Sequence, residues 1–399
     1  MPRPNDERMI FQTLDDKTEC IGVYADGKLH FQEIPENLSK TWKYTGSLAK
    51  RNIEFAWLYA NGIDLEEAAP ESLRSALQDS QRRFRAYLKA FKIGKISMRD
   101  HCFFDLVPQD FLKEFCEVKN QVTKHVFETY EKPANYDFLD KVYRLLYKIK
   151  YQNLNLSKED CRELYYTSRG RKKANELITH YGHVDYNLFG TITGRLTTLP
   201  NSFPILTVRK DFRKLIKPHN DWFISLDYNG AEARTLLHLN GHEQPEGDIH
   251  AWNIKNILPN EKERDVAKTL FFAWLYNPDS NALSADCYDR KKVLDEWYRG
   301  GYIYTPYDRK LLVDERKALN YLIQSATADR VLNRAVEIDE YLEGKKSFIS
   351  HIVHDEIVID FNDEDRESIL HVKQIFEKDN FKANVNAGKD YFNFKELKL

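Results

Sequence analysis

The stretches WFISLDYNGAEARTLLHL, residues 222–239, and SHIVHDEIVIDF, residues 350–361, decide the fold of this chain. Each contains a short apolar run that is typical of a β-strand, and each run ends at an Asp: Asp227 in the first and Asp355 in the second. The first strand leads into a helical segment, and Asp355 lies at a tight turn between two strands. Helices inserted between antiparallel strands predict an α+β fold with an antiparallel sheet.

Asp227 and Asp355 are candidate metal ligands. If their strands are neighbours, both carboxylates converge at one edge of the sheet. Two Asp at such an edge are a common way to hold one or two Mg²⁺ ions, because hard cations prefer oxygen ligands. The alternative for either residue alone is an ordinary turn Asp.

A predicted helix over residues 261–276 carries a repeat of four residues. Four residues turn a helix by about 400°, which is only about 40° more than a full turn. Residues at this spacing therefore lie on one stripe of the helix. Two cations followed by two aromatic rings can grip a triphosphate and stack on a base and sugar. A buried aromatic stripe is the alternative, but two unpaired buried cations would be costly. The stripe consists of Arg264, Lys268, Phe272 and Tyr276.

The sequence also predicts where this helix begins and ends, and it contains a second stripe. Asn260 and Glu263 predict a capping-box start, and Asn277-Pro278 predicts the stop. A long helix is predicted over residues 315–342. It carries a stripe with hydrogen-bonding groups that suit a template or minor-groove edge, and a solvated polar face is the alternative. This stripe consists of Arg316, Asn320 and Gln324.

Composition limits the class of protein. The 399 residues carry a net charge of −2, yet basic residues gather in runs at 82–99, 162–173 and 209–217, which together favour a polyanionic partner. No apolar run is long enough to span a membrane, and the N-terminus lacks a signal core. The five scattered cysteines predict neither a disulfide framework nor a zinc cluster. We therefore expect an intracellular, cytoplasmic enzyme.

Six motifs in one order resemble the family A DNA polymerases, the DNA polymerase I family. They are TGRLTTLPNSFPILTVRKDFR from residue 193, LDYNGAEAR, GDIH at 247–250, the Arg264–Tyr276 stripe, RKALNYLIQSATAD and HIVHDEIV, and NVNAGKDYF at 384–392 resembles the family's C-terminal segment. The chain departs from the family at Asn229, Gly230 and Phe271. Its stretch between the two stripes is also shorter than the family's.

The resemblance implies roles for individual residues. Asp227 and Asp355 would be catalytic and bind two Mg²⁺ ions, with the Tyr228 carbonyl as a further ligand and Lys268 as a further catalytic group. Glu232 would exclude a ribose 2′-hydroxyl. The dNTP-binding residues would be Arg264, Lys268, Phe272, Tyr276, Glu232 and His250. The DNA-binding residues would be Arg195, Arg316, Asn320, Gln324 and His354.

The same resemblance implies a right-hand polymerase fold, with an antiparallel palm sheet, helical fingers and a helical thumb. The expected division is a β-containing extension at 1–62, a thumb at 63–180, palm at 181–245, fingers at 246–312 and palm again at 313–399. About 60 residues are too few for a 3′–5′ exonuclease, so we expect none. The acids Asp15, Asp16 and Glu19 are expected to be surface charge.

The predicted function is a template-directed DNA polymerase that adds dNTPs to a primer–template, without proofreading. Whether the chain also binds a replisome or processivity partner is left open. The expected lack of an exonuclease favours a chain encoded by a phage or other mobile genome, which would act in a host cytoplasm. The alternative is a non-catalytic, polymerase-like DNA-binding subunit. A single-subunit RNA polymerase is disfavoured by Glu232.

Overall fold

The computed structural model describes residues 9–159, 161–280, 283 and 285–399. The chain divides into two compact units, residues 1–147 and residues 148–399. This division lies at a different place from each of the predicted domain boundaries. The first eight residues of the predicted N-terminal extension lie outside the described residues.

The first unit contains a five-stranded sheet in the order β3-β2-β1-β4-β5. The turn at Asp26-Gly27 has positive φ at both residues, as a tight hairpin requires, and confirms the predicted hairpin. Strands β1, β2 and β3 are antiparallel, whereas β4 and β5 run parallel to β1. The strands are β1 (Met9–Thr13), β2 (Gly22–Ala25), β3 (Lys28–Phe31), β4 (Leu38–Thr41) and β5 (Glu54–Phe55).

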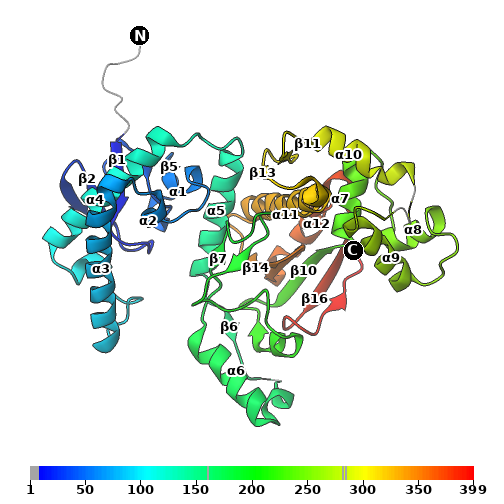
Figure 1. Ribbon diagram of the computed structural model, residues 1–399. Helices are drawn as coiled ribbons and strands as arrows, with labels where there is room; N and C mark the ends of the chain where they lie inside the picture. Colours follow the sequence, from blue (N-terminus) through cyan, green and yellow to red (C-terminus); the bar gives the residue numbers. More distant parts are fainter. Residues whose placement is uncertain (1–8, 160, 281–282, 284) are drawn as a thin grey trace. The chain divides into compact units, whose positions relative to one another are not determined.

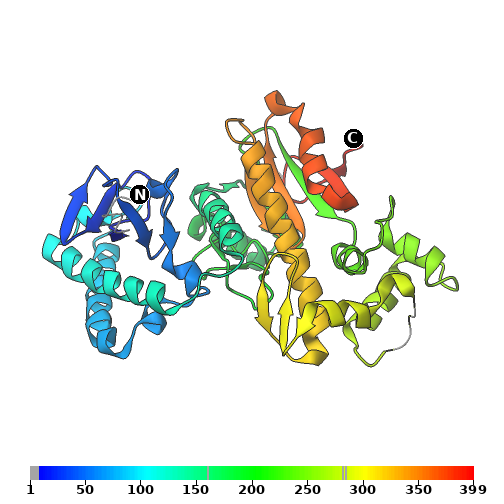
Figure 2. The ribbon, with the colours of Figure 1, turned by 90° about the horizontal axis from the view of Figure 1, so that it is seen from above.

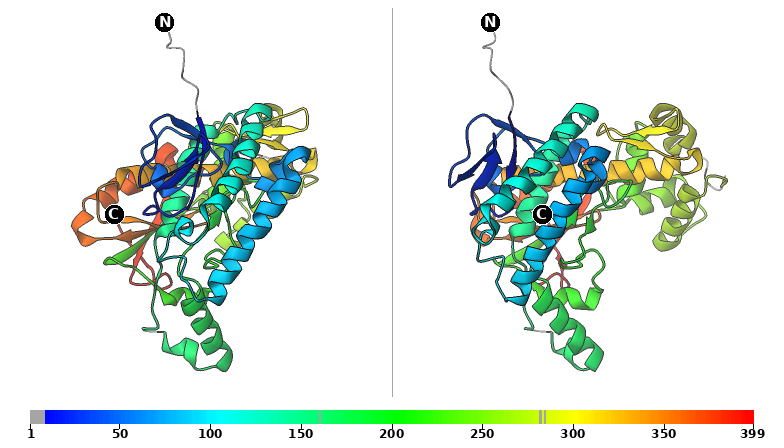
Figure 3. Two further views of the ribbon diagram at one scale, coloured as in Figure 1. Left: turned by 90° about the vertical axis from the view of Figure 1, so that its left-hand side faces the viewer. Right: turned by 60° about the vertical axis from the view of Figure 1, so that its left-hand side comes forward.

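Helices follow this sheet, as the apolar spacing predicts. The long helices α3 (Glu71–Ile93) and α4 (Gln109–Thr129) lie side by side (Figure 3). Between them, Phe91, Phe103 and Phe111 form a buried cluster. The other helices are α1 (Ala56–Tyr59), α2 (Leu65–Ala68) and α5 (Tyr136–Tyr151), which continues past the end of the first unit.

Two expectations about the first unit were wrong. A disulfide joins Cys20 to Cys102, whose Cα atoms lie 5.5 Å apart, although the sequence has no cysteine motif. The side chain of Asp15 is only 3% exposed, and it accepts a 2.6 Å hydrogen bond from the Phe103 backbone N–H. Both contacts tie the β1–β2 loop to the segment after α3, which lies more than 80 residues away in sequence.

The second unit is built on an antiparallel sheet, as predicted, and its strands lie in the order β14-β15-β10-β16-β17 (Figure 1). Its central strand is β10, whose apolar residues are buried because helices and neighbouring strands cover them. The strands are β10 (Trp222–Tyr228), β14 (Phe348–Val353), β15 (Glu356–Phe361), β16 (Ala383–Gly388) and β17 (Lys395–Glu396).

The long helix α11 (Glu315–Tyr341) contacts β14 and β15 and runs along the sheet (Figure 2). It also packs against α12 (Ser368–Phe376) and α7 (Ala231–Leu239), and α7 follows β10 after a single tight turn. Among the described residues, none of the helices combines the length and apolar character that a membrane span needs.

The segment between α7 and α11 packs around a hydrophobic core of its own. It includes Phe271, Trp274 and Tyr288 and packs against Leu322 of α11. Its elements are α8 (Ile249–Asn256), α9 (Arg264–Tyr276), α10 (Arg290–Trp297) and the small sheet β11 (Tyr298–Arg299), β12 (Tyr302–Tyr304) and β13 (Lys310–Leu312).

The predicted capping box of α9 was wrong. The helix begins at Arg264, three residues later than expected, and its N-cap Glu263 makes no side-chain capping bond. It ends at Tyr276 before Asn277, as predicted. The remaining elements are β6 (Asn155–Leu156) paired with β9 (Ile216–Lys217), β7 (Tyr186–Asn187) paired with β8 (Thr197–Thr198), and α6 (Ser168–His180).

Candidate active site

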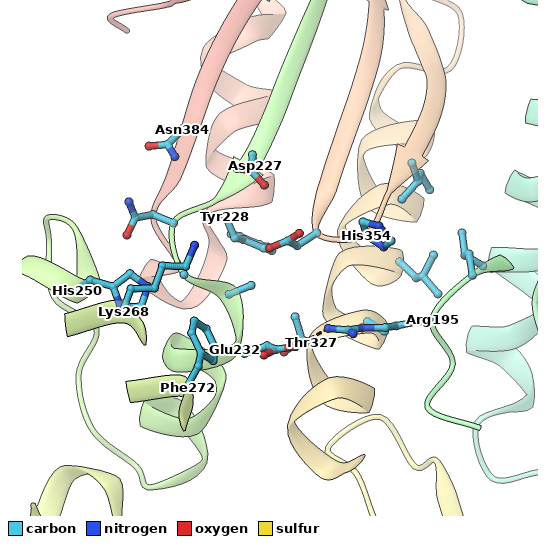
Figure 4. A pocket seen from close by; sticks show the side chains of 18 of the residues that line it. Arg195, Asp227, Tyr228, Glu232, His250, Lys268, Phe272, Thr327, His354 and Asn384 are labelled. Atoms are coloured by element: carbon cyan, nitrogen blue, oxygen red, sulfur yellow. Dashed lines mark hydrogen bonds and ion pairs between the residues drawn. The ribbon is translucent and has the colours of Figure 1, made fainter. Parts of the chain in front are cut away.

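A cavity of about 570 Å³ lies where β10 ends, between α7, α9 and α11 (Figure 4). Residues from motifs more than 150 positions apart in sequence converge on it. The predicted site residues that line this cavity are Arg195, Asp227, Tyr228, Glu232, His250, Arg264, Lys268, Phe272, Tyr276, His354 and Asp355.

The sheet register brings Asp227 and Asp355 together. Strand β10 pairs directly with β15, and Asp227 is the cross-strand partner of Glu356. Asp355 precedes Glu356 in the two-residue turn between β14 and β15, where His354 has a positive φ of 58°. The condition for convergence, that the two strands are neighbours, is therefore met.

The electrostatics of Asp227 reflect this arrangement. Burial, reinforced by the carboxylates of Asp355 and Glu356, raises the pKa of Asp227 to about 7, and only Lys268 opposes the rise. Glu356 itself is held by hydrogen bonds from the hydroxyls of Ser225 at 2.5 Å and Tyr391 at 2.8 Å. A cation between the two Asp would relieve the repulsion that raises this pKa.

The donor set at this edge fits a hard divalent cation. The described residues contain no group of three or more His, Cys, Asp or Glu side chains placed to hold a metal. Two carboxylates that share a cavity with open space are what Mg²⁺ commonly uses, since it keeps several waters and takes oxygens from substrate phosphates. Asp227, Asp355 and the Tyr228 carbonyl could supply these oxygens.

The α9 stripe faces the cavity with all four of its members. The rings of Phe272 and Tyr276 stack, with centroids 5.7 Å apart and planes 17° apart. His250 lies beside Phe272, with ring centroids 5.9 Å apart. The prediction that the repeat forms one functional face, rather than a buried aromatic stripe, is consistent with this placement.

Asp248 does not line the cavity itself, but it binds the cavity residue Arg264, and sequence reasoning missed this role. It caps α8 through the Ala251 N–H and accepts two bonds from the Arg264 guanidinium, at 3.0 and 2.7 Å. Burial raises its pKa, but hydrogen bonds from Arg264, Asn229 and Ala251 outweigh this and lower the pKa below its usual range. Its position as an N-cap two residues before His250 was the available signal.

Glu232 links two other predicted residues. Its carboxylate forms an ion pair with Arg195 and accepts a hydrogen bond from the Tyr276 hydroxyl. Burial raises the pKa of Glu232, and the Arg195 charge opposes the rise. The Glu232 side chain is 13% exposed and that of Arg195 39%, so the pair lies at the rim of the cavity.

His250 is almost completely buried, and neither ring nitrogen has a hydrogen-bond partner among the described residues. Burial lowers its pKa to about 4, so the ring is neutral near pH 7. A buried ring with two unsatisfied nitrogens that lines a cavity is suited to bind a ligand oxygen.

The second predicted stripe lies outside this cavity. Asn320 and Gln324 do share a face of α11, because the Gln324 amide donates to the Asn320 oxygen at 2.6 Å. Arg316 pairs with Asp279 at 2.6 Å and is largely exposed. The structure thus separates these residues from the Asp227 site.

Two residues that line the cavity, Asn384 and Asn229, were not predicted as site residues. Asn384 is the β16 partner of Asp227 in the sheet register and lines the same cavity. Asn229 bridges Asp248 and the Ile249 N–H. Asn384 is the first residue of the stretch that resembles the family's C-terminal segment, but its position beside Asp227 depends on strand pairing, which local sequence does not specify.

Known proteins are similar to this chain over part of its length. No protein-family model matches it. The thermostable DNA polymerase I of Thermus aquaticus is 25% identical over 272 residues, which cover 54% of this chain and 33% of that protein. The DNA polymerase of Mycobacterium phage D29 is 28% identical over 170 residues, 34% of this chain and 28% of that protein. The chain thus spans about a third of the length of these relatives.

A solved structure is similar over almost the whole chain. The POL domain of Pol1 from M. smegmatis, in complex with DNA primer-template and dNTP, matches with a TM-score of 0.63 and 12% identity, and covers 97% of this chain and 96% of that one. The chain therefore shares its fold with a DNA polymerase POL domain, and about half of its length is similar in sequence to DNA polymerase I.

Proposed function

We propose that this chain is a template-directed DNA polymerase that adds dNTPs to a primer 3′ end. The observation that carries the proposal is the convergence, in one cavity, of Asp227 and Asp355 with the cations and rings of the α9 stripe. A carboxylate pair opposite two cations suits a reaction in which a metal–triphosphate complex is bound and pyrophosphate leaves.

Asp227, Asp355 and the Tyr228 carbonyl would hold two Mg²⁺ ions. When bound, the metal would supply Lewis-acid activation of the primer 3′-hydroxyl and stabilise charge on the leaving group. The pKa of Asp227, raised to about 7, supports this assignment, because a site that binds protons this readily when empty is suited to a cation.

Arg264 and Lys268 would bind the triphosphate, and Phe272 and Tyr276 would stack on the incoming base and sugar. Asp248 would fix the Arg264 guanidinium through its two hydrogen bonds. The neutral His250 would donate a hydrogen bond to a phosphate oxygen. Lys268 lies close enough to Asp227 to lower its pKa, so it spans the phosphate and metal regions.

We also propose that the chain contains the palm, fingers and thumb segments of a polymerase, as follows. The sheet around β10 would be the palm, and residues 246–312 the fingers. Helices within 63–180 would form the thumb and hold the duplex through their basic runs. Arg195, His354 and the α11 stripe of Arg316, Asn320 and Gln324 would contact primer and template.

The first unit supports a further proposal, that the chain does not proofread. Asp15 is engaged with Lys17 and the Phe103 backbone, and so is not free to hold a metal. Incubation of a mispaired primer with enzyme and Mg²⁺, without dNTP, should leave its length unchanged. Shortening that persists in the Asp227→Asn variant would contradict this.

The main test is extension of a labelled primer–template by the wild type and by Asp227→Asn and Asp355→Asn. Each variant should lose at least about a thousandfold in extension rate, because a metal ligand is removed, while binding of primer–template changes little. Asp363→Asn, an exposed acid after β15, is the matched control. A wild type that binds the duplex but adds no nucleotide would favour the non-catalytic alternative.

A further inference from the structure

A buried ion pair that no part of the proposed function uses lies next to the cavity. Arg309, in the β12–β13 hairpin, donates two hydrogen bonds to Asp329 of α11, from Nε at 2.9 Å and from Nη2 at 2.6 Å. The side chain of Arg309 is 8% exposed and that of Asp329 is fully buried. Such a two-pronged pair fixes the plane of the guanidinium group.

Two hydrogen bonds fix the backbone of Arg309. The Thr305 N–H donates to the Arg309 carbonyl at 2.9 Å, and the Arg309 N–H donates to the Thr305 hydroxyl at 3.2 Å. The backbone of Arg309 is therefore held by its own turn, and its guanidinium group is held by Asp329.

Gly194 lies directly on this guanidinium group. It has a φ of +78°, and a Cβ built on it would be 2.5 Å from both Cζ and Nη2 of Arg309. A real side chain cannot approach so closely, so this position requires both the left-handed backbone and the missing Cβ of glycine. The loop of residues 191–195 therefore packs directly on the Arg309–Asp329 ion pair.

The residue that follows Gly194 is Arg195, which lines the cavity and pairs with Glu232. Its backbone is tied to the same loop, because the Thr191 hydroxyl donates to the Arg195 carbonyl at 2.8 Å. The residues before Asp329 face the cavity as well: Thr327 lines it and hydrogen-bonds Thr235 of α7 at 2.8 Å. Helix α7 also carries Glu232.

We propose that Arg309 and Asp329 are positioning residues for Arg195. The buried pair supports Gly194 and so sets where the Arg195 guanidinium lies relative to Glu232 and the cavity. The inference rests on the proposed polymerase function, in which Arg195 contacts the primer strand. Displacement of such a group by about 1 Å can cost about 100-fold in rate.

The test is a double-mutant cycle between Arg309→Lys and Arg195→Ala, measured as kcat/KM for extension of a matched primer. Arg309→Lys keeps the charge but loses the two-pronged geometry. Alone, it should lower kcat/KM about tenfold. In the Arg195→Ala background the same change should have less than about a twofold effect, because nothing remains for it to position.

Arg334→Lys is the matched control for this cycle. Arg334 is another buried arginine of α11. Its ion-pair partners Glu337 and Asp379 do not line the cavity, and its contact with a cavity residue is with the Tyr228 side chain rather than with Arg195. Arg334→Lys should lower the midpoint of thermal unfolding, and its effect on extension should not depend on Arg195. If the effects of Arg309→Lys and Arg195→Ala on kcat/KM instead multiply independently, the ion pair has only a structural role and the proposal is overturned.

Gly194→Ala provides a second route if Arg309→Lys does not fold. It leaves both charges in place and should give the same dependence on Arg195. If Arg195→Ala extends primers at the wild-type rate while Asp227→Asn is inactive, the positioning proposal fails and the polymerase proposal stands. If Asp227→Asn is also fully active, the polymerase proposal itself fails.

Discussion

Asp227 is a residue of the candidate site whose pKa is clearly affected by its surroundings. Its carboxylate is largely buried, faces two other carboxylates across the sheet, and has Lys268 as the cation that lowers its pKa. Without a metal this arrangement costs free energy whenever Asp227 is ionised. A strongly raised pKa in a cavity residue is typical of functional sites.

The pH dependence of unfolding in EDTA should reveal this cost. The pKa of Asp227 is about 7 in the folded chain and about 4 when unfolded, so its contribution to stability is full below about pH 4 and is lost as the pH rises through 7. Asp227→Asn should therefore be more stable than wild type at pH 8, by up to about 4 kcal/mol, and nearly equal to it at pH 4.

Chemical denaturation at the two pH values measures this difference. Glu243→Gln, which changes an exposed carboxylate in the loop after α7, is the control and should show no such pH-dependent gain. An Asp227→Asn variant that is less stable than wild type at both pH values would contradict the expected sign.

Sugar selection should separate two other residues of the cavity. Glu232 is held by Arg195 and Tyr276, so its carboxylate has a fixed place in the cavity. If Glu232 excludes a ribose 2′-hydroxyl, as the resemblance implies, Glu232→Ala should raise ribonucleotide incorporation at least about tenfold. Phe272→Tyr should raise dideoxynucleotide incorporation, because it adds a hydroxyl where the 3′-position would lie.

Single-turnover incorporation of dNTP, rNTP and ddNTP by each variant decides between these effects. Each substitution serves as the control for the other, since neither should change the second preference. Unchanged ribonucleotide selection in Glu232→Ala would mean that α7 does not face the nucleotide.

At the scale of elements, the turn from β10 into α7 determines where the site residues lie. Gly230 makes this turn with a φ of +66°, and a Cβ on it would be 2.4 Å from Ile249 and 3.3 Å from His250, both in α8. The turn therefore sets the distance between the strand that carries Asp227 and the helix that carries His250.

Gly230→Ala should destabilise the chain by about 2–3 kcal/mol and lower primer extension, because backbone strain and the contact with α8 add. Gly241→Ala is a matched control, since Gly241 has a similar φ of +77° but no atom within 4 Å of the added Cβ. It should cost only about 1 kcal/mol of strain and leave extension unchanged. Equal effects of the two changes would mean that contact with α8 is unimportant.

At the scale of the whole molecule, the two compact units are stabilised differently. The second unit depends on apolar packing around α11 and the β10 sheet. The first unit adds the Cys20–Cys102 disulfide, which links residues separated by 82 positions. Closing so long a loop reduces the entropy of the unfolded chain, an effect of about 4 kcal/mol in the simplest account.

The double variant Cys20→Ser/Cys102→Ser should therefore unfold at a lower temperature than wild type. Reductant should lower the unfolding temperature of the wild type to that of the double variant and leave the double variant unchanged. Cys287→Ser, which removes a free cysteine of the second unit, is the control. A wild type that is insensitive to reductant would show that this bond does not stabilise the fold.

The sequence by itself determined the features that depend on local spacing. The strand–turn pattern around Asp227 and Asp355 and the four-residue repeat from Arg264 to Tyr276 are read correctly, because strand alternation and helical periodicity act over a few residues. The antiparallel sheet and the long helix α11 follow from the same signals. The resemblance of these segments to family motifs added the expected roles of the individual site residues.

The tertiary structure alone decided the contacts between residues that are far apart in sequence. Asp248 meets Arg264, Asn384 lies beside Asp227, Cys20 reaches Cys102, and Arg309 pairs with Asp329 under a glycine of another loop. None of these partners is specified by local spacing. Each depends on how strands pair and how helices pack, because only the folded chain brings such groups within a few ångströms.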